Sequence, residues 1–576
     1  MLRNLVIFFL FHAVTAQNDE LFDLNIIHYN DFHAHFDQVA LSGGPCNPSE
    51  GDCIGGFSRL YTAIMEVLQA EPDSLVLNAG DTFQGTIWYN YLRWNVSQHF
   101  MNMLPHDAHV LGNHEFDHGI DGLYLYLEML NSPMLGANVN ATLEPAIAPY
   151  VKNHIIVERK GRKIGIIGIL LRTFSAPIGN VIMEDELEAV NREAAILTAQ
   201  GVDIIIVLSH VGYDSDIVRP SGWAISYLAY PSLNEGTQGY PFSAVRLCCL
   251  RTRSLAARMP PEVDIIVGGH SHSLLFNGVA PDGSTPVGEY PTVVTQANGH
   301  QILIVQAAAY TRYLGNIKLT FDSTGKMVSW NGKAIYLGTS IVRDPTIERL
   351  LEPWRNEVDA IGKEVLGSSL SALNRGCYRG ECNLGSWACD GFLEELMPRA
   401  EQGAWGYAHV CLINAGGIRT NIESGEITTE ALLMAMPFEN YVQVYDLKGE
   451  FLLEALEFSV GVTQTDPANF YSGRMLQVGG IRVVYNASAP VGARVASAAV
   501  RCVRCDVPRY LPLERDAVYK VLTQNYIGDG GGGYTMLSRN RENVENIGVD
   551  YQLLQEYLRR QGTVLRDIDG RIQIVY

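Results

Sequence analysis

Basic residues are scarce in this chain of 576 residues, because 42 Lys and Arg stand against 62 Asp and Glu, a formal net charge of −20. No tract of basic side chains could neutralise a nucleic-acid backbone, so the composition argues against a nucleic-acid partner. An anionic substrate would also need a local source of positive charge, which bound metal ions can supply. We find no internal repeat, and no low-complexity run beyond the glycine cluster Gly528–Gly533.

Long apolar runs are also missing after the first residues. The N-terminus has a basic residue, Arg3, then the short apolar run Leu5–Phe11 and a small-residue site at Val14–Ala16. This pattern is typical of a secretory signal peptide over residues 1–16, and a buried first strand is the alternative. The C-terminal residues 570–576 have no lipid-anchor signal. We therefore expect a secreted, extracellular protein without a membrane anchor.

Cysteines and glycosylation motifs agree with export. Eight of the ten cysteines form local groups suited to short disulfide loops: Cys46/Cys53, Cys377/Cys382, Cys389/Cys411 and Cys502/Cys505. The last group is a C-x-x-C motif, which suggests zinc or redox chemistry in a cytosolic chain but a structural disulfide in an exported one. Sequons at Asn95, Asn140 and Asn486 are candidate glycosylation sites.

The length exceeds that of a usual single domain, so two domains are expected. Every metal-type motif lies in the first 340 or so residues. Apolar residues at helical spacing follow over Asp344–Glu364. Asp344 and Pro345 form a sound helix start, with a capping Asp and then Pro at the first helical position. We predict a connecting helix here.

Five short motifs each follow an apolar run and contain residues that bind metals. They are Asp31-Phe32-His33, Gly80-Asp81, Gly112–Asp117, Ser209-His210 and Gly268–His272. The runs at Leu24–His28, Leu75–Leu77, Asp203–Leu208 and Val263–Val267 predict buried strands. Loops at the carboxyl ends of strands in open α/β sheets converge on one crevice. The pattern therefore predicts a site where two divalent cations handle an oxyanion such as phosphate.

In this order, the motifs resemble the signature of the 5′-nucleotidase family. N-D-x-H, A-G-D, G-N-H-E-F-D, S-H and G-G-H-S-H resemble its metallophosphoesterase domain. Asn414–Arg419 (N-A-G-G-I-R), Met436–Phe438 (M-P-F) and Asn525–Tyr534 resemble its C-terminal nucleotide-binding domain. The stretch Asn78–Asn90, continued by Arg93–Asn95, looks most like the salivary apyrases of blood-feeding arthropods.

The resemblance implies a two-domain α/β fold. A four-layer α/β/β/α metallophosphoesterase domain would span residues 22–342, a linker helix residues 343–365, and an α/β nucleotide-binding domain residues 366–576. The four cysteine pairs match family positions, and family members move the C-terminal domain about the linking helix. Segment 220–253 has no counterpart in the family. It is either a surface insertion loop or an unspliced intron carried into the sequence, and we favour the second.

The resemblance also implies two divalent metal ions. Zinc and manganese suit the donor types, and calcium or magnesium can serve polyphosphate substrates. The first ion would bind Asp31, His33, Asp81 and His272. The second would bind Asp81, Asn113, His210 and His270, with Asp81 bridging because a carboxylate can bind two cations. His114 would stabilise the phosphoryl oxygens or protonate the leaving oxygen, and Asp117 would orient its ring. His35 and His118 lie off the pattern and are not expected to be ligands.

Nucleotide contacts follow from the same resemblance. Phe438 and Tyr526 match positions that sandwich the base, although packing in a core is an alternative for both. Asn414 and Arg419 match positions on the phosphate side. Other contacts differ, because Tyr378 stands where the family often has Arg, with Arg379 one place later. Gly532 stands at the place of the acid that binds the ribose, and Asp529 lies three residues earlier.

Loss of such charge-assisted contacts, each worth roughly 1.5–3 kcal/mol, would weaken binding of AMP more than that of longer phosphate chains. We therefore expect a secreted apyrase that converts ATP and ADP to AMP and phosphate, and the resemblance suggests an anti-platelet role in saliva. The alternatives are a 5′-nucleotidase acting on AMP, a broader sugar-nucleotide or cyclic-nucleotide phosphoesterase, and a non-catalytic nucleotide-binding protein. The sequence does not indicate the oligomeric state.

Overall fold

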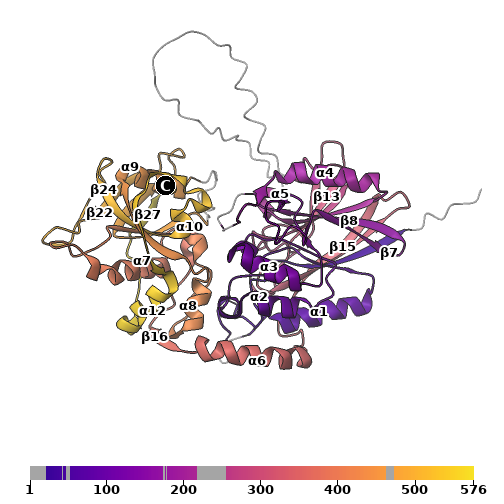
Figure 1. Cartoon of the computed structure of the whole chain (residues 1–576), viewed down its shortest axis with the longest axis horizontal. Coiled ribbons are helices and arrows are strands. Elements are labelled where there is room, and N and C mark those ends of the chain that lie inside the picture. The colour runs from indigo at the N-terminus through magenta and orange to yellow at the C-terminus, as the bar shows by residue number, and fades with distance from the viewer. Residues whose placement is uncertain are drawn as a thin grey trace, which may run out of the picture.

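The computed structural model describes residues 21–41, 43–46, 52–172, 176, 178–216, 255–461 and 473–576. The predicted signal peptide and segment 220–253 lie outside these residues. The chain forms two lobes, and helix α6 (Pro345–Gly362) runs along the base of both (Figure 1). Each lobe combines helices with mixed sheets, so the predicted two-domain α/β fold is confirmed.

Two sheets form the centre of the N-terminal domain. The first has the order β15 (Met327–Tyr336), β14 (Tyr313–Phe321), β1 (Phe22–Tyr29), β2 (Leu75–Asn78), β3 (Ala108–Val110), β4 (Met134–Leu135), β6 (Val151–Lys152). The second has the order β12 (Thr292–Thr295), β13 (Gln301–Val305), β11 (Val263–Gly268), β10 (Ile204–His210), β8 (Arg162–Leu170), β7 (His154–Arg159). Two short strands, β5 (Val139–Asn140) and β9 (Ile182–Met183), pair separately.

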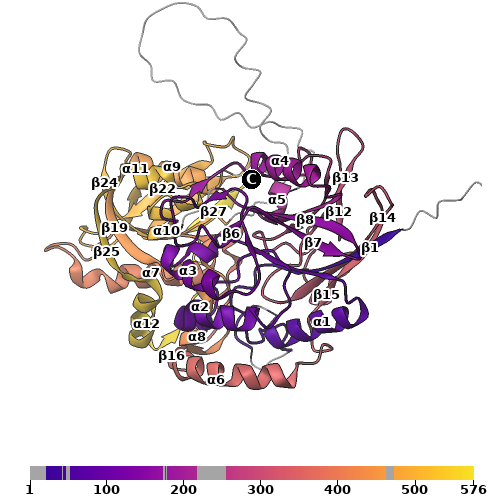
Figure 2. The ribbon, with the colours of Figure 1, turned by 45° about the vertical axis from the view of Figure 1, so that its right-hand side comes forward.

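The two sheets pack face to face. Leu24 and Leu77 of the first sheet share one buried core with Ile166, Ile206 and Ile265 of the second. Helices α1 (Phe57–Ala70), α2 (Ile87–Met101) and α3 (Gly119–Met129) cover the outer face of the first sheet, around a second core. Helices α4 (Glu186–Ala199) and α5 (Tyr213–Asp216) lie against the second sheet (Figure 2). The result is four layers, α/β/β/α.

Parallel pairing determines where the site forms. β1 pairs in parallel with β2, and β2 with β3, within the first sheet. β8, β10 and β11 are likewise parallel within the second sheet. The carboxyl ends of these strands therefore lie at one edge of the sandwich, as expected for open α/β sheets.

The C-terminal domain is built on three sheets. The largest has the order β20 (Leu476–Gly479), β17 (Val410–Asn414), β24 (Val518–Gln524), β19 (Tyr441–Lys448), β25 (Glu542–Val549). The second has the order β23 (Tyr510–Pro512), β22 (Val495–Arg501), β21 (Ile481–Asn486), β27 (Ile572–Val575). The third has the order β18 (Gly425–Thr428), β16 (Val365–Ser369), β26 (Thr563–Val564). The helices are α7 (Asn383–Glu395), α8 (Thr429–Ala435), α9 (Gly449–Ser459), α10 (Asn525–Gly528), α11 (Thr535–Asn540) and α12 (Asp550–Gln561).

Helix α6 begins as its sequence predicts. The Asp344 side chain accepts hydrogen bonds from the backbone N–H groups of Thr346 (2.7 Å) and Ile347 (2.9 Å), which caps the helix. Ile347, Leu351 and Val358 are buried. The helix contacts α1 and α2 on one side and α8 on the other, so it connects both domains physically.

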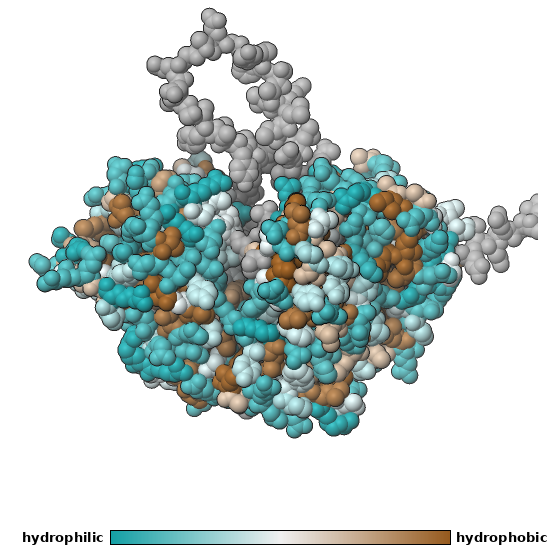
Figure 3. Space-filling view, in the orientation of Figure 1, coloured by the Kyte–Doolittle hydropathy of each residue, from teal (hydrophilic) through white to brown (hydrophobic). Residues whose placement is uncertain are grey.

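Within the described residues, disulfides join Cys46 to Cys53, Cys377 to Cys382, Cys389 to Cys411 and Cys502 to Cys505. Of the candidate glycosylation sites, Asn95 is exposed, whereas Asn140 and Asn486 are half-buried. Apolar side chains on the face seen in Figure 3 form small groups separated by hydrophilic ones. Among helices of the described residues, none combines the length and hydropathy needed to cross a bilayer.

Candidate active site

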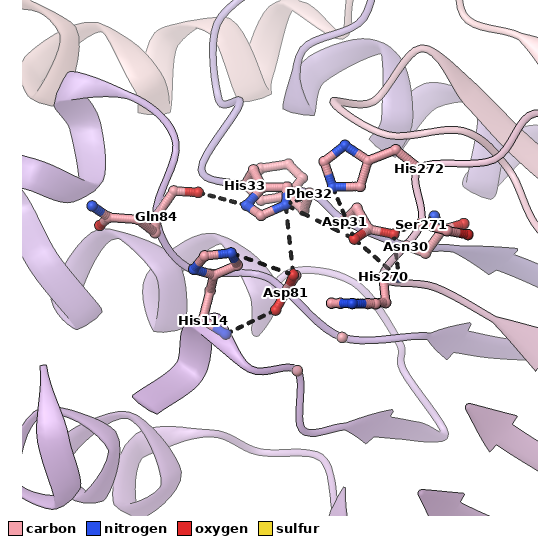
Figure 4. Close-up of polar contacts among 12 residues, drawn as sticks. Asn30, Asp31, Phe32, His33, Asp81, Gln84, His114, His270, Ser271 and His272 are labelled. Atoms are coloured by element: carbon pink, nitrogen blue, oxygen red, sulfur yellow. Dashed lines mark hydrogen bonds and ion pairs between the residues drawn. The ribbon is translucent and has the colours of Figure 1, made fainter. Parts of the chain in front are cut away.

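The predicted metal ligands all stand at the carboxyl ends of parallel strands. Figure 4 shows the side chains of Asp31, His33, Asp81, His270 and His272 gathered there. Asp31 and His33 follow β1, Asp81 follows β2, Asn113 follows β3, His210 ends β10, and His270 and His272 follow β11. Asp31, Asp81 and His210 are fully buried, so the ligand atoms are held away from bulk solvent.

Three overlapping groups of candidate ligand atoms result: Asp31, His33 and His272, called the first cluster; Asp81, His210 and His270, called the second; and His33, Asp81 and His114 between them. In the first, Asp31 Oδ1 lies 3.2 Å from His272 Nε2, which lies 3.1 Å from His33 Nε2. In the second, Asp81 Oδ2 lies 3.0 Å from His210 Nε2. There His270 Nδ1 lies 2.9 Å from Asn113 Oδ1. Asp81 Oδ2 is also 3.6 Å from His33 Nε2, so this carboxylate lies between the clusters.

The donor set fits divalent cations. His33 Nδ1 donates to the Gln84 carbonyl at 2.7 Å, so the Nε2 lone pair faces the cluster, as is usual for metal-binding histidines. Burial lowers the pKa of both His33 and His272, which favours their neutral rings. The Nε2 atoms of the two rings face each other. A cation satisfies two such lone pairs at once. Nitrogen and oxygen donors of this kind suit zinc and manganese.

The second cluster also favours positive charge. His210 Nδ1 lies 2.7 Å from the Ala79 carbonyl, which directs Nε2 at Asp81. Burial would lower the pKa of His210, but the Asp81 carboxylate outweighs burial and raises that pKa to about 10. The space between these two side chains therefore attracts a proton or a cation, and metal binding would release the proton.

The backbone is strained at the same place. Asp31 (51°), His33 (48°), Asp81 (54°), His270 (73°) and His272 (53°) all have positive φ. Each such residue costs of the order of 1–3 kcal/mol and persists only where surrounding contacts hold it. The loops hold one another here, because Asp31 N donates to the Gly80 carbonyl and His33 N to the Asp81 carbonyl, both at 3.0 Å.

Glu115 is a site residue that sequence reasoning missed. Its Oε1 accepts hydrogen bonds from the backbone N–H of Thr82 (2.6 Å) and Phe83 (3.2 Å). Its Oε2 accepts from Gly112 (2.6 Å) and Asp81 (3.1 Å). One buried carboxylate thus ties the loop after β2 to the loop after β3. Its position inside the G-N-H-E-F-D motif was the available signal.

The predicted catalytic pair is formed. His114 Nδ1 and Asp117 Oδ2 are 2.7 Å apart, and the His114 backbone N–H donates to Asp81 Oδ1 at 2.9 Å. Burial would lower the pKa of His114, but the carboxylates of Asp117 and Asp81 outweigh burial and raise it. The ring Nε2 lies 4.0 Å from Asp81 Oδ2 and faces the clusters.

The C-terminal domain closes over this site. The Phe438 ring stacks on His114, with centroids 5.1 Å apart and planes 9° apart. Arg419 Nη2 lies 3.2 Å from His272 Nε2, and its guanidinium lies 5.4 Å from the Phe438 ring. Burial raises the pKa of Tyr526, whose ring packs against the core of the C-terminal domain.

The remaining predicted substrate residues have contacts of their own or are exposed. Asn414 ends β17, and its Nδ2 is 3.4 Å from the Gly473 carbonyl. Asp529 pairs with Arg541 at 2.6 Å. Arg379 is exposed.

Two residues that sequence reasoning did not name lie beside Arg419. Arg375 donates to the Arg419 carbonyl. The Tyr310 ring stacks on His35 at 4.3 Å and lies 5.2 Å from His272. His35 thus packs beside the metal ligands, bonded to backbone carbonyls through Nδ1.

Both halves of the chain match described families. Residues 24–274 match the calcineurin-like phosphoesterases, and residues 363–539 match the 5′-nucleotidase C-terminal domain. An apyrase of Tabanus yao is 36% identical over 560 residues, covering 96% of this chain and 94% of the relative. A 5′-nucleotidase of Homo sapiens is 33% identical, covering 96% and 91%. The crystal structure of a 5′-nucleotidase precursor from Thermus thermophilus superposes with a TM-score of 0.80 at 30% identity, covering 96% of this chain and 99% of that one.

Proposed function

Because the chain belongs to the 5′-nucleotidase family and is a metal-dependent phosphohydrolase, we propose that it removes terminal phosphates from extracellular ATP and ADP, leaving AMP. The resemblance seen in the sequence motifs is confirmed at the level of the family. The observation that carries the proposal is the pairing of a two-cluster metal site with an arginine and an aromatic ring from the opposite domain. A phosphate could then bind between the metal site and the arginine, and the base could stack on the aromatic ring.

The seven strand-end residues would hold two divalent cations, whose charge would offset that of the phosphate and lower the pKa of a bound water towards about 7. The His114 ring, held by Asp117, would stabilise the phosphoryl oxygens or give its Nε2 proton to the leaving oxygen. Arg419 would bind phosphate oxygens, since its guanidinium lies beside the first cluster. Zinc and manganese are the proposed occupants, with calcium or magnesium serving polyphosphate substrates.

The nucleoside would lie against the C-terminal domain. Phe438 is proposed to stack on one face of the base and Tyr526 on the other, each such contact contributing about 1–3 kcal/mol. Asn414 would contact the phosphate side. Stacking tolerates different bases, so we expect little discrimination between adenine and other nucleobases.

Weak binding of the nucleoside would favour hydrolysis of substrates with longer phosphate chains. The Asp529 carboxylate is paired with Arg541, which reduces its availability to a ribose hydroxyl, and Arg379 is exposed. One missing charge-assisted hydrogen bond weakens binding by about ten- to a hundredfold. AMP depends on such contacts more than ADP or ATP, whose phosphates reach the metal site. The apyrase relative at 36% identity supports the same direction.

Hydrolysis of AMP is the second candidate, since 5′-nucleotidases are among the relatives. A binding protein without activity is less well supported, because the ligand clusters and the His114–Asp117 pair are complete. Secretion is also a proposal, supported by four disulfides, which persist in oxidising compartments.

The test is phosphate release from ATP, ADP and AMP by purified protein, with each candidate metal added after chelation. We expect turnover of ATP and ADP to exceed that of AMP. His114→Ala serves as the inactive control. Turnover of AMP far above that of ADP would overturn the proposal in favour of a 5′-nucleotidase.

A further inference from the structure

The loop that carries Phe438 is held by the opposite domain. Phe438 lies between α8 and β19 of the C-terminal domain. The Pro437 carbonyl, one residue earlier, accepts hydrogen bonds from the side chains of Gln84 and Asn90 (2.8 Å for Asn90). Both donors belong to the N-terminal domain. The N-terminal domain, which carries the metal centre, therefore holds the backbone next to the Phe438 ring.

The residue after Phe438 adds an ion pair across the domains. Arg93 Nη1 lies 2.8 Å from Glu439 Oε2, and Arg93 Nη2 donates to Oε1 at 3.2 Å. His118 Nε2 lies 3.4 Å from the same carboxylate and contacts Arg93. Burial would raise the pKa of Glu439, but His118 and Arg93 outweigh burial and lower it. A bidentate ion pair of this kind fixes the relative orientation of the two side chains and also pairs their charges.

Both partners of the pair have unusual backbone conformations. Helix α2 is interrupted at Arg93, whose φ is 57° and ψ −149°, a region that residues other than glycine rarely enter. Glu439 has φ 51°. Strain of this kind persists where surrounding contacts demand it and clusters at clamps and switches. Here it coincides with the contact between the two domains.

We propose that Arg93, His118 and Glu439 form an interdomain clamp that holds Phe438 against His114. The three are positioning residues: they keep the stacking ring and Arg419 at the metal centre without touching the reacting atoms. His118 directly follows Asp117 in the chain, so the clamp is anchored beside the catalytic pair. This inference takes its substrate, a nucleotide, from the proposed function. The closed arrangement of the domains does not depend on that function.

Loosening the clamp should affect substrates unequally. A nucleotide needs the metal centre and the C-terminal domain together, so opening lowers kcat/KM in proportion to the closed fraction lost. Glycerol 2-phosphate has a phosphate but no base, so domain opening would cost it the Arg419 contact but no stacking contact. Removing one half-buried ion pair of about 1 kcal/mol lowers the closed-to-open equilibrium constant about fivefold, which is the upper limit for the loss of the closed fraction.

The experiment compares four proteins with the wild type. Glu439→Gln and Arg93→Gln each remove one charge of the pair, and the double variant Arg93→Glu with Glu439→Arg exchanges the charges. Glu401→Gln is the matched control, because Glu401 pairs with Arg504 on the exposed surface of the C-terminal domain. Phosphate release from ADP and from glycerol 2-phosphate is measured for each, and small-angle X-ray scattering measures the radius of gyration.

The clamp predicts a specific pattern. Each single variant should lose up to about fivefold in kcat/KM for ADP, lose clearly less for glycerol 2-phosphate, and show a larger radius of gyration. The charge-exchanged variant should recover part of the loss, and Glu401→Gln should match the wild type. Unchanged scattering in both single variants, or an equal loss for both substrates, would overturn the clamp. A wild type inactive on nucleotides would refute the proposed function alone, since scattering still decides the clamp.

Discussion

Replacing Glu115 by Gln should weaken metal binding, although Glu115 is not itself a predicted ligand. Its two oxygens accept four backbone hydrogen bonds, from Asp81, Thr82, Phe83 and Gly112. An amide offers one acceptor oxygen and turns an NH₂ group towards two of these donors. Each buried donor left without a partner costs about 1–3 kcal/mol, so two place the cost at roughly 2–6 kcal/mol. The loop that carries Asp81, the proposed bridging ligand, should relax accordingly.

The assay is the metal concentration that gives half-maximal phosphate release after chelation. Loss of a residue that orients a ligand typically costs about 10- to 100-fold in metal affinity, so we expect the half-maximal concentration to rise by that factor. Glu193→Gln is the control, because Glu193 is equally buried but bonds the side chains of Asn153, His154 and Arg192. It should lower the unfolding temperature and leave the metal requirement unchanged. A Glu115→Gln protein with the wild-type metal requirement would refute the reasoning.

Four other perturbations have expected outcomes. Chelation should abolish phosphate release and added manganese or zinc should restore it; activity that survives exhaustive chelation would contradict a metal site. His114→Ala should lower kcat by about 10²- to 10⁴-fold while nucleotide affinity in equilibrium dialysis changes little, because the ring acts on the proton and the phosphoryl oxygens. Phe438→Ala should raise KM for ADP by about five- to a hundredfold, the equivalent of one lost stacking contact, and should spare glycerol 2-phosphate. Burial raises the pKa of Asp264 to about 8, against about 3.9 in an unfolded chain, so the folded protein binds more protons between these values and stability falls as pH rises. Asp264→Asn should flatten that fall in thermal unfolding between about pH 5 and 8, whereas the half-exposed Asp203, changed to Asn, should leave it intact.

The gathering of the candidate metal ligands could be predicted because two simple regularities place them. Apolar runs predict buried strands, and parallel strands gather their carboxyl ends at one edge. Asp31, Asp81 and His210 each follow or end such a run, and the structure brings them together. The capping Asp344 likewise marked the start of α6, just before its first buried side chain.

Contacts between surface groups far apart in the chain could not be predicted. Nothing in the local sequence pairs Arg93 with Glu439 or Asp529 with Arg541, because isolated charges follow no period. The positive φ of Asp31 is equally invisible, since it arises from a hydrogen bond between two loops. Such features depend on tertiary packing. Sequence patterns predict which residues enter the core, but not which side chains or loops meet outside it.

The central claim is that one site holds two cations and a nucleotide between the domains. A crystal grown with manganese and the non-hydrolysable α,β-methylene analogue of ADP tests it directly, by anomalous scattering. We predict two manganese peaks with an Asp81 oxygen between them, the terminal phosphate beside Arg419, and the base between Phe438 and Tyr526. A single peak or none at the strand ends, or a nucleotide bound away from them, would contradict the account.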